Sequence, residues 1–145
     1  MFATMVALAL ASSPPLLADG ACGFWRGRMW GNDTDVKTQL WLCRRKNELC
    51  GTLSWSGKSG ENVRSLAGDV RRREFRLRDV SFLVSRPRGD WRFCLIDSYR
   101  LETNAQNGTL QGSYRSTACA DEAGISLEAI APPAAVRSCF EQPAS

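Results

Sequence analysis

Two runs of alternating apolar and polar residues meet at a short polar turn, and a cysteine stands on each side of that turn. The first run is Val36–Cys43 and the second is Leu49–Trp55. Alternation at every second residue is typical of β-strands with one buried face, and the connecting sequence RRKNEL is polar enough to turn at the surface. We therefore predict a β-hairpin here, clamped by a disulfide between Cys43 and Cys50, as the centre of the fold.

The same alternation recurs along the rest of the chain, with glycine, proline or Asn-Gly signals between the runs. Short strands joined by short turns predict an all-β domain, built as a small eight-stranded antiparallel up-and-down barrel. A two-sheet sandwich is the alternative. The predicted strands are Gly23–Trp30, Val36–Cys43, Leu49–Trp55, Val63–Val70, Glu74–Val80, Trp91–Glu102, Thr109–Ser116 and Ile125–Ile130.

Residues 1–18 carry no charge and contain an apolar core, a Ser-Pro-Pro break and a small residue at Ala18. This composition is typical of a secretory signal peptide cleaved before Asp19. The apolar core is shorter than the roughly 20 residues that a membrane-spanning helix needs. We predict a signal peptide over residues 1–18, a single β-barrel domain over residues 19–145, and a secreted or periplasmic location.

All six cysteines follow the predicted signal peptide, and an even number in a small exported chain predicts three disulfides. The sequence has no histidine and no Cys-x-x-Cys pair, so its spacing does not suit zinc; we expect neither a metal nor another cofactor. A cross-strand disulfide needs its two cysteines on the same face and close together. This condition favours the pairs Cys43–Cys50, Cys94–Cys119 and Cys22–Cys139, the last of which pins the C-terminal tail to the barrel.

Asp97 is the one charged residue on the predicted inward face of the longest strand. A buried carboxylate requires a hydrogen-bond partner, a raised pKa or a ligand. One interpretation is a polar anchor inside a small-ligand pocket, and the other is a structural aspartate bonded to a tyrosine or to a turn near the barrel mouth. The predicted lining of such a pocket is Asp97, Tyr99, Tyr114, Trp25, Trp55 and Trp91.

Arginines recur in the fourth to seventh predicted strands, which are neighbours in an up-and-down barrel, and we assign them to the outer face. Such a face attracts polyanions or acidic proteins, although an ordinary solvated exterior, with carboxylates such as Asp79 among the arginines, is the alternative. Nucleic acid fits this face poorly, because the aromatic residues are expected to point inward rather than to interleave with the basic groups. The predicted partner-binding residues are Arg64, Arg76, Arg78, Arg92, Arg100 and Arg115.

Two stretches resemble known families. Gly23-Phe24-Trp25 is similar to the G-x-W that opens lipocalin-like (calycin) barrels, and the resemblance implies that Trp25 plugs one end of a calycin-like barrel. The hairpin Val36–Trp55 resembles the core of a family of small exported bacterial proteins, domain of unknown function 2147, in which a strand ending in cysteine precedes an L-C-G-x-[IL]-x-W strand. This second resemblance implies a secreted β-barrel and supplies no activity.

The absence of histidine removes the commonest general base and the Ser-His-Asp and Cys-His catalytic arrangements. We therefore expect a secreted or periplasmic, non-enzymatic binding protein. The first interpretation is an interaction or inhibitor module, whose basic outer face engages an acidic protein or a polyanion such as lipopolysaccharide. The alternative is a small-molecule carrier that holds its ligand inside the barrel around Asp97.

Overall fold

The structure is a computed structural model that describes residues 16–31, 35–132 and 136–141. Most of the predicted signal peptide, residues 1–15, lies outside the described residues. Among the described residues, no helix is long and apolar enough to cross a membrane. The strands are β1 (Cys22–Gly31), β2 (Asp35–Arg45), β3 (Glu48–Gly57), β4 (Gly60–Arg71), β5 (Glu74–Pro87), β6 (Asp97–Asn104), β7 (Thr109–Ser116) and β8 (Asp121–Ile130).

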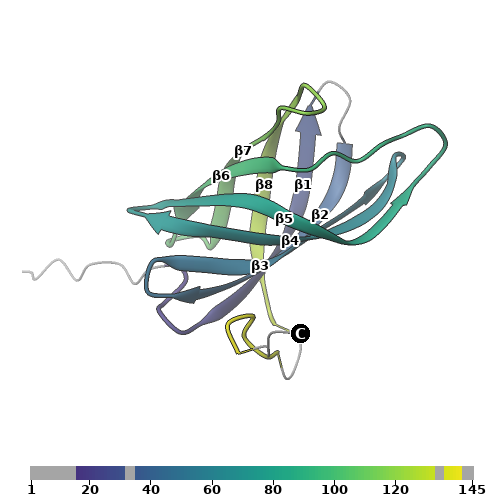
Figure 1. Ribbon diagram of the computed structural model, residues 1–145. Coiled ribbons are helices and arrows are strands. Elements are labelled where there is room, and N and C mark those ends of the chain that lie inside the picture. Colours follow the sequence, from purple (N-terminus) through teal and green to yellow (C-terminus); the bar gives the residue numbers. More distant parts are fainter. Residues whose placement is uncertain (1–15, 32–34, 133–135, 142–145) are drawn as a thin grey trace, which may run out of the picture.

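Each strand pairs antiparallel with the next one in the chain, and β8 pairs with β1, so that the sheet closes into a barrel (Figure 1). The predicted eight-stranded up-and-down barrel is confirmed, and the sandwich alternative is wrong. Closure gives both lateral edges of the sheet a partner strand, which removes the exposed edges of an open sheet.

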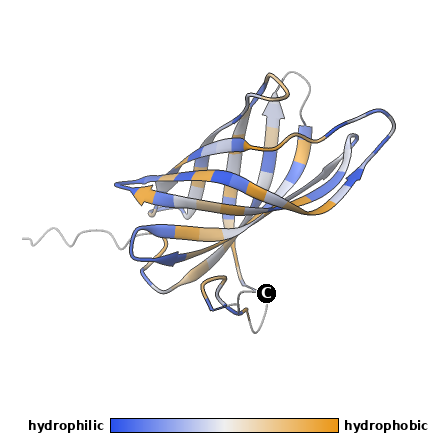
Figure 2. Cartoon of the chain, viewed as in Figure 1, coloured by the Kyte–Doolittle hydropathy of each residue, from blue (hydrophilic) through white to orange (hydrophobic). Residues whose placement is uncertain are grey.

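One face of every strand contributes to a single apolar core inside the barrel. Along β4 and β5, hydrophobic and hydrophilic residues alternate in the chain (Figure 2), as strand geometry requires when one face is buried. Burial of each large apolar side chain contributes roughly 1.5–3 kcal/mol to folding. Trp25 is part of this core, with its ring edge-on to Phe75 at 6.4 Å between centroids.

The sixth strand is shorter than the sequence predicts, because it begins at Asp97 rather than at Trp91. β5 and β6 pair only between Glu74–Arg78 and Ser98–Glu102. Beyond that ladder β5 continues to Pro87 beside β4, with register shifts that mark β-bulges, and bulges bend a strand. Residues 91–96 therefore leave the barrel wall and cross one of its ends, where the disulfide Cys94–Cys119 ties them to the β7–β8 connection.

Two of the three predicted disulfide pairings are wrong. The pair Cys94–Cys119 is confirmed, but Cys43 bonds to Cys22, and Cys50 bonds to Cys139. Cys43 lies directly opposite Cys22 in the β1–β2 ladder and directly opposite Cys50 in the β2–β3 ladder. Spacing along the chain cannot choose between these two neighbours.

Because Cys43 bonds to Cys22, Cys50 is available to bond to Cys139 of the C-terminal segment. This segment returns to the outside of the β2–β3 hairpin, where Arg45 lies over the ring of Phe140 at 4.4 Å. The tail is therefore pinned by a disulfide, as predicted, but to β3 instead of to β1.

Candidate functional site

Arg64 and Asp79 lie inside the barrel, although the sequence analysis placed both on its outer surface. Arg64 is 1% exposed, and Asp79 is equally buried. The signal was present in the sequence: Arg64 stands two residues before Leu66 and Asp79 two after Leu77, so each shares the face of a core leucine. Asp97 is fully buried, as predicted.

These three charged groups form one hydrogen-bonded cluster. Arg64 Nη1 donates to Asp79 Oδ2 at 2.7 Å and also to Asp97 Oδ2. Arg64 Nε donates to Asn62 Oδ1 at 2.9 Å, and the Tyr99 hydroxyl donates to Asp79 Oδ1 at 2.8 Å. The prediction that Asp97 bonds directly to a tyrosine is therefore wrong: its partner is Arg64.

The divergence of β5 from β6 explains why a carboxylate is needed at position 79. The ladder ends at the pair Arg78 and Ser98, so the next backbone N–H, that of Asp97, has no strand partner. Asp79 Oδ2 accepts a hydrogen bond from this N–H at 3.0 Å. The cluster thus satisfies a buried backbone group at the point where the sheet opens.

Two aromatic rings fix the guanidinium of Arg64. Its Cζ atom lies 4.0 Å from the centroid of the Trp55 ring and 5.1 Å from that of Phe82. Cation–π contacts of this kind strengthen when water is excluded. Arg64 is thereby held in one place by both its hydrogen bonds and its neighbours.

The cluster contains one cation and two carboxylates, and burial shifts the protonation equilibria of its members. Burial raises the pKa of Asp79, and the attraction of Arg64 offsets only part of that effect. Burial alone would lower the pKa of Arg64, but its interactions with Tyr99 and the two carboxylates outweigh burial and raise it. Burial likewise raises the pKa of Tyr99 and that of Tyr114, so both hydroxyls keep their protons in neutral solution.

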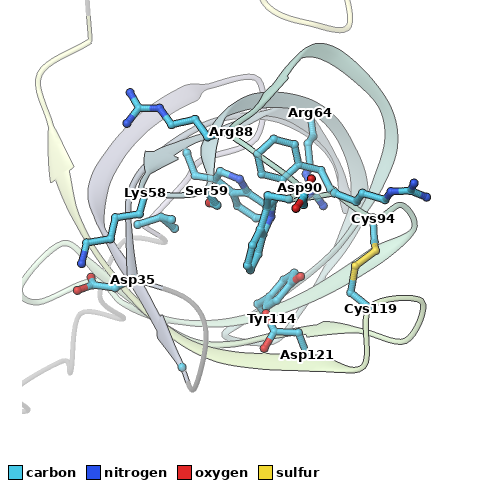
Figure 3. Close-up of a pocket in the computed structure, with 16 residues that line it drawn as sticks. Asp35, Lys58, Ser59, Arg64, Arg88, Asp90, Cys94, Tyr114, Cys119 and Asp121 are labelled. Carbon is cyan, nitrogen blue, oxygen red and sulfur yellow. A yellow bond between two sulfur atoms is a disulfide. The ribbon is translucent and has the colours of Figure 1, made fainter.

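Above the cluster a cavity of about 560 Å³ opens at one end of the barrel, which we call the mouth. Figure 3 shows Tyr114 and Arg64 within the ring of strands, whereas Arg88 points toward the periphery. Its lining combines aromatic walls with charged residues at the rim. The lining residues are Gly31, Asp35, Val36, Trp55, Lys58, Ser59, Arg64, Arg88, Asp90, Trp91, Arg92, Phe93, Cys94, Tyr114, Cys119 and Asp121.

The structure brings together only part of the predicted pocket. Trp55, Tyr114 and Trp91 line the cavity, although Trp91 does so from the crossing segment and not from a strand. Asp97 and Tyr99 do not line it: Asp97 bonds to Arg64, and Tyr99 contacts both Arg64 and the ring of Tyr114. Trp25 is buried against Phe75 and Gly23, away from the mouth.

Only some of the predicted arginines lie together on the outer face. Arg78, Arg100 and Arg115 are exposed on the outside of β5, β6 and β7, and Arg76 is half-buried there. Carboxylates accompany most of them. Glu74 lies 2.8 Å from Arg76 and 3.8 Å from Arg100, and Glu122 lies 2.7 Å from Arg115. Arg92 is not on this face, because it belongs to the segment that crosses the mouth.

The described residues hold no group of three or more histidine, cysteine, aspartate or glutamate side chains arranged to bind a metal ion. What the site offers chemically is a cavity with aromatic walls, charged residues at its rim and the fixed guanidinium of Arg64 at its floor.

Comparison of the chain with models of known protein families gives no match, and comparison with curated protein sequences gives none either. The resemblances of Gly23–Trp25 to lipocalin-like barrels and of Val36–Trp55 to domain of unknown function 2147 therefore stay predictions.

Proposed function

We propose that this protein is a non-enzymatic binding protein that holds a small, mainly apolar ligand in the cavity at the barrel mouth. The observation that carries the proposal is the cavity itself. Its volume of about 560 Å³ falls within the roughly 300–1,000 Å³ that is typical of small-molecule sites. Aromatic walls around one fixed polar group are also the usual composition of such sites.

The disulfides indicate where the protein works. Three disulfides join the six cysteines, and the described cysteines leave no free thiol. Bonds of this kind persist outside the reducing cytoplasm, so the protein is extracytoplasmic. Secretion or export to a periplasm, guided by a signal peptide over residues 1–18, is part of the proposal.

Binding rather than catalysis is proposed because the site offers no catalytic pair. The chain has no histidine. Asp35, Asp90 and Asp121 line the cavity, but Asp35 and Asp90 are exposed and Asp35 pairs with Arg28. The two buried carboxylates, Asp79 and Asp97, are held by Arg64 and do not line the cavity. A general base must be within hydrogen-bond reach of the proton that it removes. Neither carboxylate meets that condition from beneath the guanidinium.

A fluorescence titration with the neutral dye N-phenyl-1-naphthylamine tests the proposal. We expect saturable binding with an increase in dye emission, and a loss of affinity of about five-fold in Trp91→Ala, since an apolar wall contributes on the order of 1 kcal/mol. Trp30→Ala is the matched control, because Trp30 is similarly exposed (49% against 39%) but lies outside the mouth. Equal affinities in the two variants, or no binding to the wild type, would remove the basis of the proposal.

A second candidate function is the binding of a polyanion or an acidic protein to the outer arginine face. The observation that favours it is the register: Arg76 lies directly opposite Arg100, and Ser98 alone separates Arg78 from Arg115. Four guanidinium groups thus gather on three neighbouring strands. Exposed charges are screened over a Debye length of about 8–10 Å, so binding through this face would weaken steeply with salt.

Retention on a heparin column tests this second candidate. The double charge reversal Arg76→Glu/Arg78→Glu is expected to elute at clearly lower salt than the wild type. The control is Arg26→Glu/Lys37→Glu, which makes the same change in net charge on the outside of β1 and β2. If both double variants shift by the same amount, retention follows net charge and not this face.

A further inference from the structure

We infer that the ligand of the mouth cavity presents a neutral hydrogen-bond acceptor, such as a carbonyl oxygen, to Arg64. This inference rests on the proposed function and names the chemical class of the ligand. It follows from the unused donor capacity of Arg64, from the charge balance behind the guanidinium and from the apolar walls around it.

Arg64 is a charged side chain that is 1% exposed and reaches the cavity from the core. Its Nη1 and Nε atoms are occupied by Asp79, Asp97 and Asn62. Its Nη2 atom donates no hydrogen bond to any residue in the described part of the chain. A guanidinium has five N–H donors in a rigid fork, so a group entering from the mouth meets a donor whose position is already fixed.

The charge behind the guanidinium decides which acceptor suits that donor. Asp79 and Asp97 both hydrogen-bond to Arg64 from its far side, so two carboxylates more than balance its single positive charge. An anionic ligand group would be attracted by Arg64 and repelled by both carboxylates through a low-dielectric interior, where Coulomb interactions are strong. Little net attraction would remain to offset the desolvation of the anion.

A cationic ligand group fits no better. At the floor it would meet the guanidinium first, and the two carboxylates of the cluster lie behind that group. The other carboxylates of the lining, Asp35, Asp90 and Asp121, are accompanied there by the cations Lys58, Arg88 and Arg92. A neutral oxygen accepts the hydrogen bond from Arg64 without bringing a second charge into the barrel. Hydrogen bonds to a charged donor are also about twice as strong as those between neutral groups.

The aromatic walls of the cavity indicate the shape and polarity of the rest of the ligand. Trp55 packs edge-on against Tyr114 at 5.8 Å between ring centroids, and Phe93 packs against Trp55 at 6.2 Å. These rings leave an apolar space above Arg64 that suits a flat hydrocarbon or aromatic body. The exposed cations of the rim, Lys58 and Arg88, lie farther out, where solvent screens them.

Four naphthalene derivatives that share one ring system test the inference at pH 7 by quenching of tryptophan fluorescence. 2-Acetonaphthone carries a neutral acceptor, and 2-isopropenylnaphthalene has the same shape with a CH₂ group in place of the oxygen. 2-Naphthoate is the anion, and 2-naphthylmethylammonium is the cation. We expect acetonaphthone to bind about ten-fold more tightly than the alkene, which corresponds to one hydrogen bond from a charged donor, and more tightly than either ion.

The comparison uses the unaltered protein, so it does not depend on a variant that must fold. Equal affinity for the ketone and the alkene, or tightest binding of naphthoate, would overturn the inference and leave the proposed function standing. If none of the four compounds binds and N-phenyl-1-naphthylamine also fails to bind, the proposed function is wrong as well.

Discussion

Arg64 is the residue on which the interior of this barrel depends. It joins two buried carboxylates, an asparagine and two aromatic rings, and it forms the floor of the cavity. Removal of one partner of a buried ion pair leaves an uncompensated charge in a low-dielectric interior, which is costly. The stability of the fold therefore depends on this cluster being complete.

Replacement of Arg64 by methionine keeps most of the volume and removes the charge. We expect the free energy of unfolding to fall by about 3–5 kcal/mol, since Asp79 and Asp97 are then buried without a cation. Urea unfolding followed by tryptophan fluorescence measures the change. The matched control is the triple variant Arg64→Met/Asp79→Asn/Asp97→Asn, which should recover most of the lost stability; if it stays as unstable as the single variant, charge is not the cause.

The raised pKa of Asp79 gives a dependence on pH with a definite sign. A carboxyl group whose pKa is higher in the folded state binds its proton more tightly there. Its contribution to stability is fully present below its ordinary value near 3.8 and is lost as pH rises through the raised pKa. We therefore expect the free energy of unfolding of Asp79→Asn, relative to wild type, to increase as pH is raised from 3 to 7.

Urea unfolding at a series of pH values measures this difference. The control is Asp69→Asn, which makes the same chemical change at a side chain that is 42% exposed. A relative stability of Asp79→Asn that falls with rising pH would contradict the assignment of a raised pKa.

At the scale of the elements, the row of cysteines across β1, β2 and β3 shows what spacing in the sequence can and cannot determine. Cys22, Cys43 and Cys50 are successive cross-strand neighbours, so two pairings are open to Cys43. Peptide mapping without reduction should find Cys22–Cys43, Cys50–Cys139 and Cys94–Cys119. A Cys43–Cys50 peptide would show that the C-terminal tail does not dock on β3.

The segment before β1 is also an element of the fold. Leu17 is 3% exposed and belongs to the apolar core, and its carbonyl oxygen accepts a hydrogen bond from Arg44 Nη1 at 2.9 Å. We expect Leu17→Ala to lower the free energy of unfolding by about 2–3 kcal/mol through lost burial and a cavity. The mature chain that the proposed signal peptide implies starts at Asp19 and lacks this side chain, so it should be at least as destabilised relative to the full chain.

Leu16→Ala provides the comparison for this prediction. Leu16 is only partly buried at the edge of the core, so its truncation should cost clearly less. Thermal or urea unfolding of the three chains distinguishes them. If the chain that starts at Asp19 is as stable as the one that keeps Leu17, the packing of this segment does not contribute to the fold.

Over the whole molecule, alternation and turn signals were enough to predict the barrel, the number of strands and the inward position of Asp97. The alternation of Trp91, Phe93 and Leu95 predicts a strand that the structure does not have. It reflects packing across the mouth instead, since Phe93 contacts Trp55 without belonging to a strand. The outward prediction for Arg64 and Asp79 is wrong because it rests on their charge, whereas their positions in the strands place them inside the barrel. The cavity depends on the departure of residues 91–96 from the wall, and no local pattern reports that departure.

Occupation of the mouth above Arg64 by a small ligand can be tested in one measurement, because the chain has five tryptophans. Each indole N–H gives its own NMR signal, and the signals can be followed during a titration with 2-acetonaphthone. We predict that the signals of Trp55 and Trp91, which line the cavity, shift progressively and saturate, while those of Trp25, Trp30 and Trp41 remain in place. Shifts confined to Trp30, or no shift at any tryptophan, would contradict the claim.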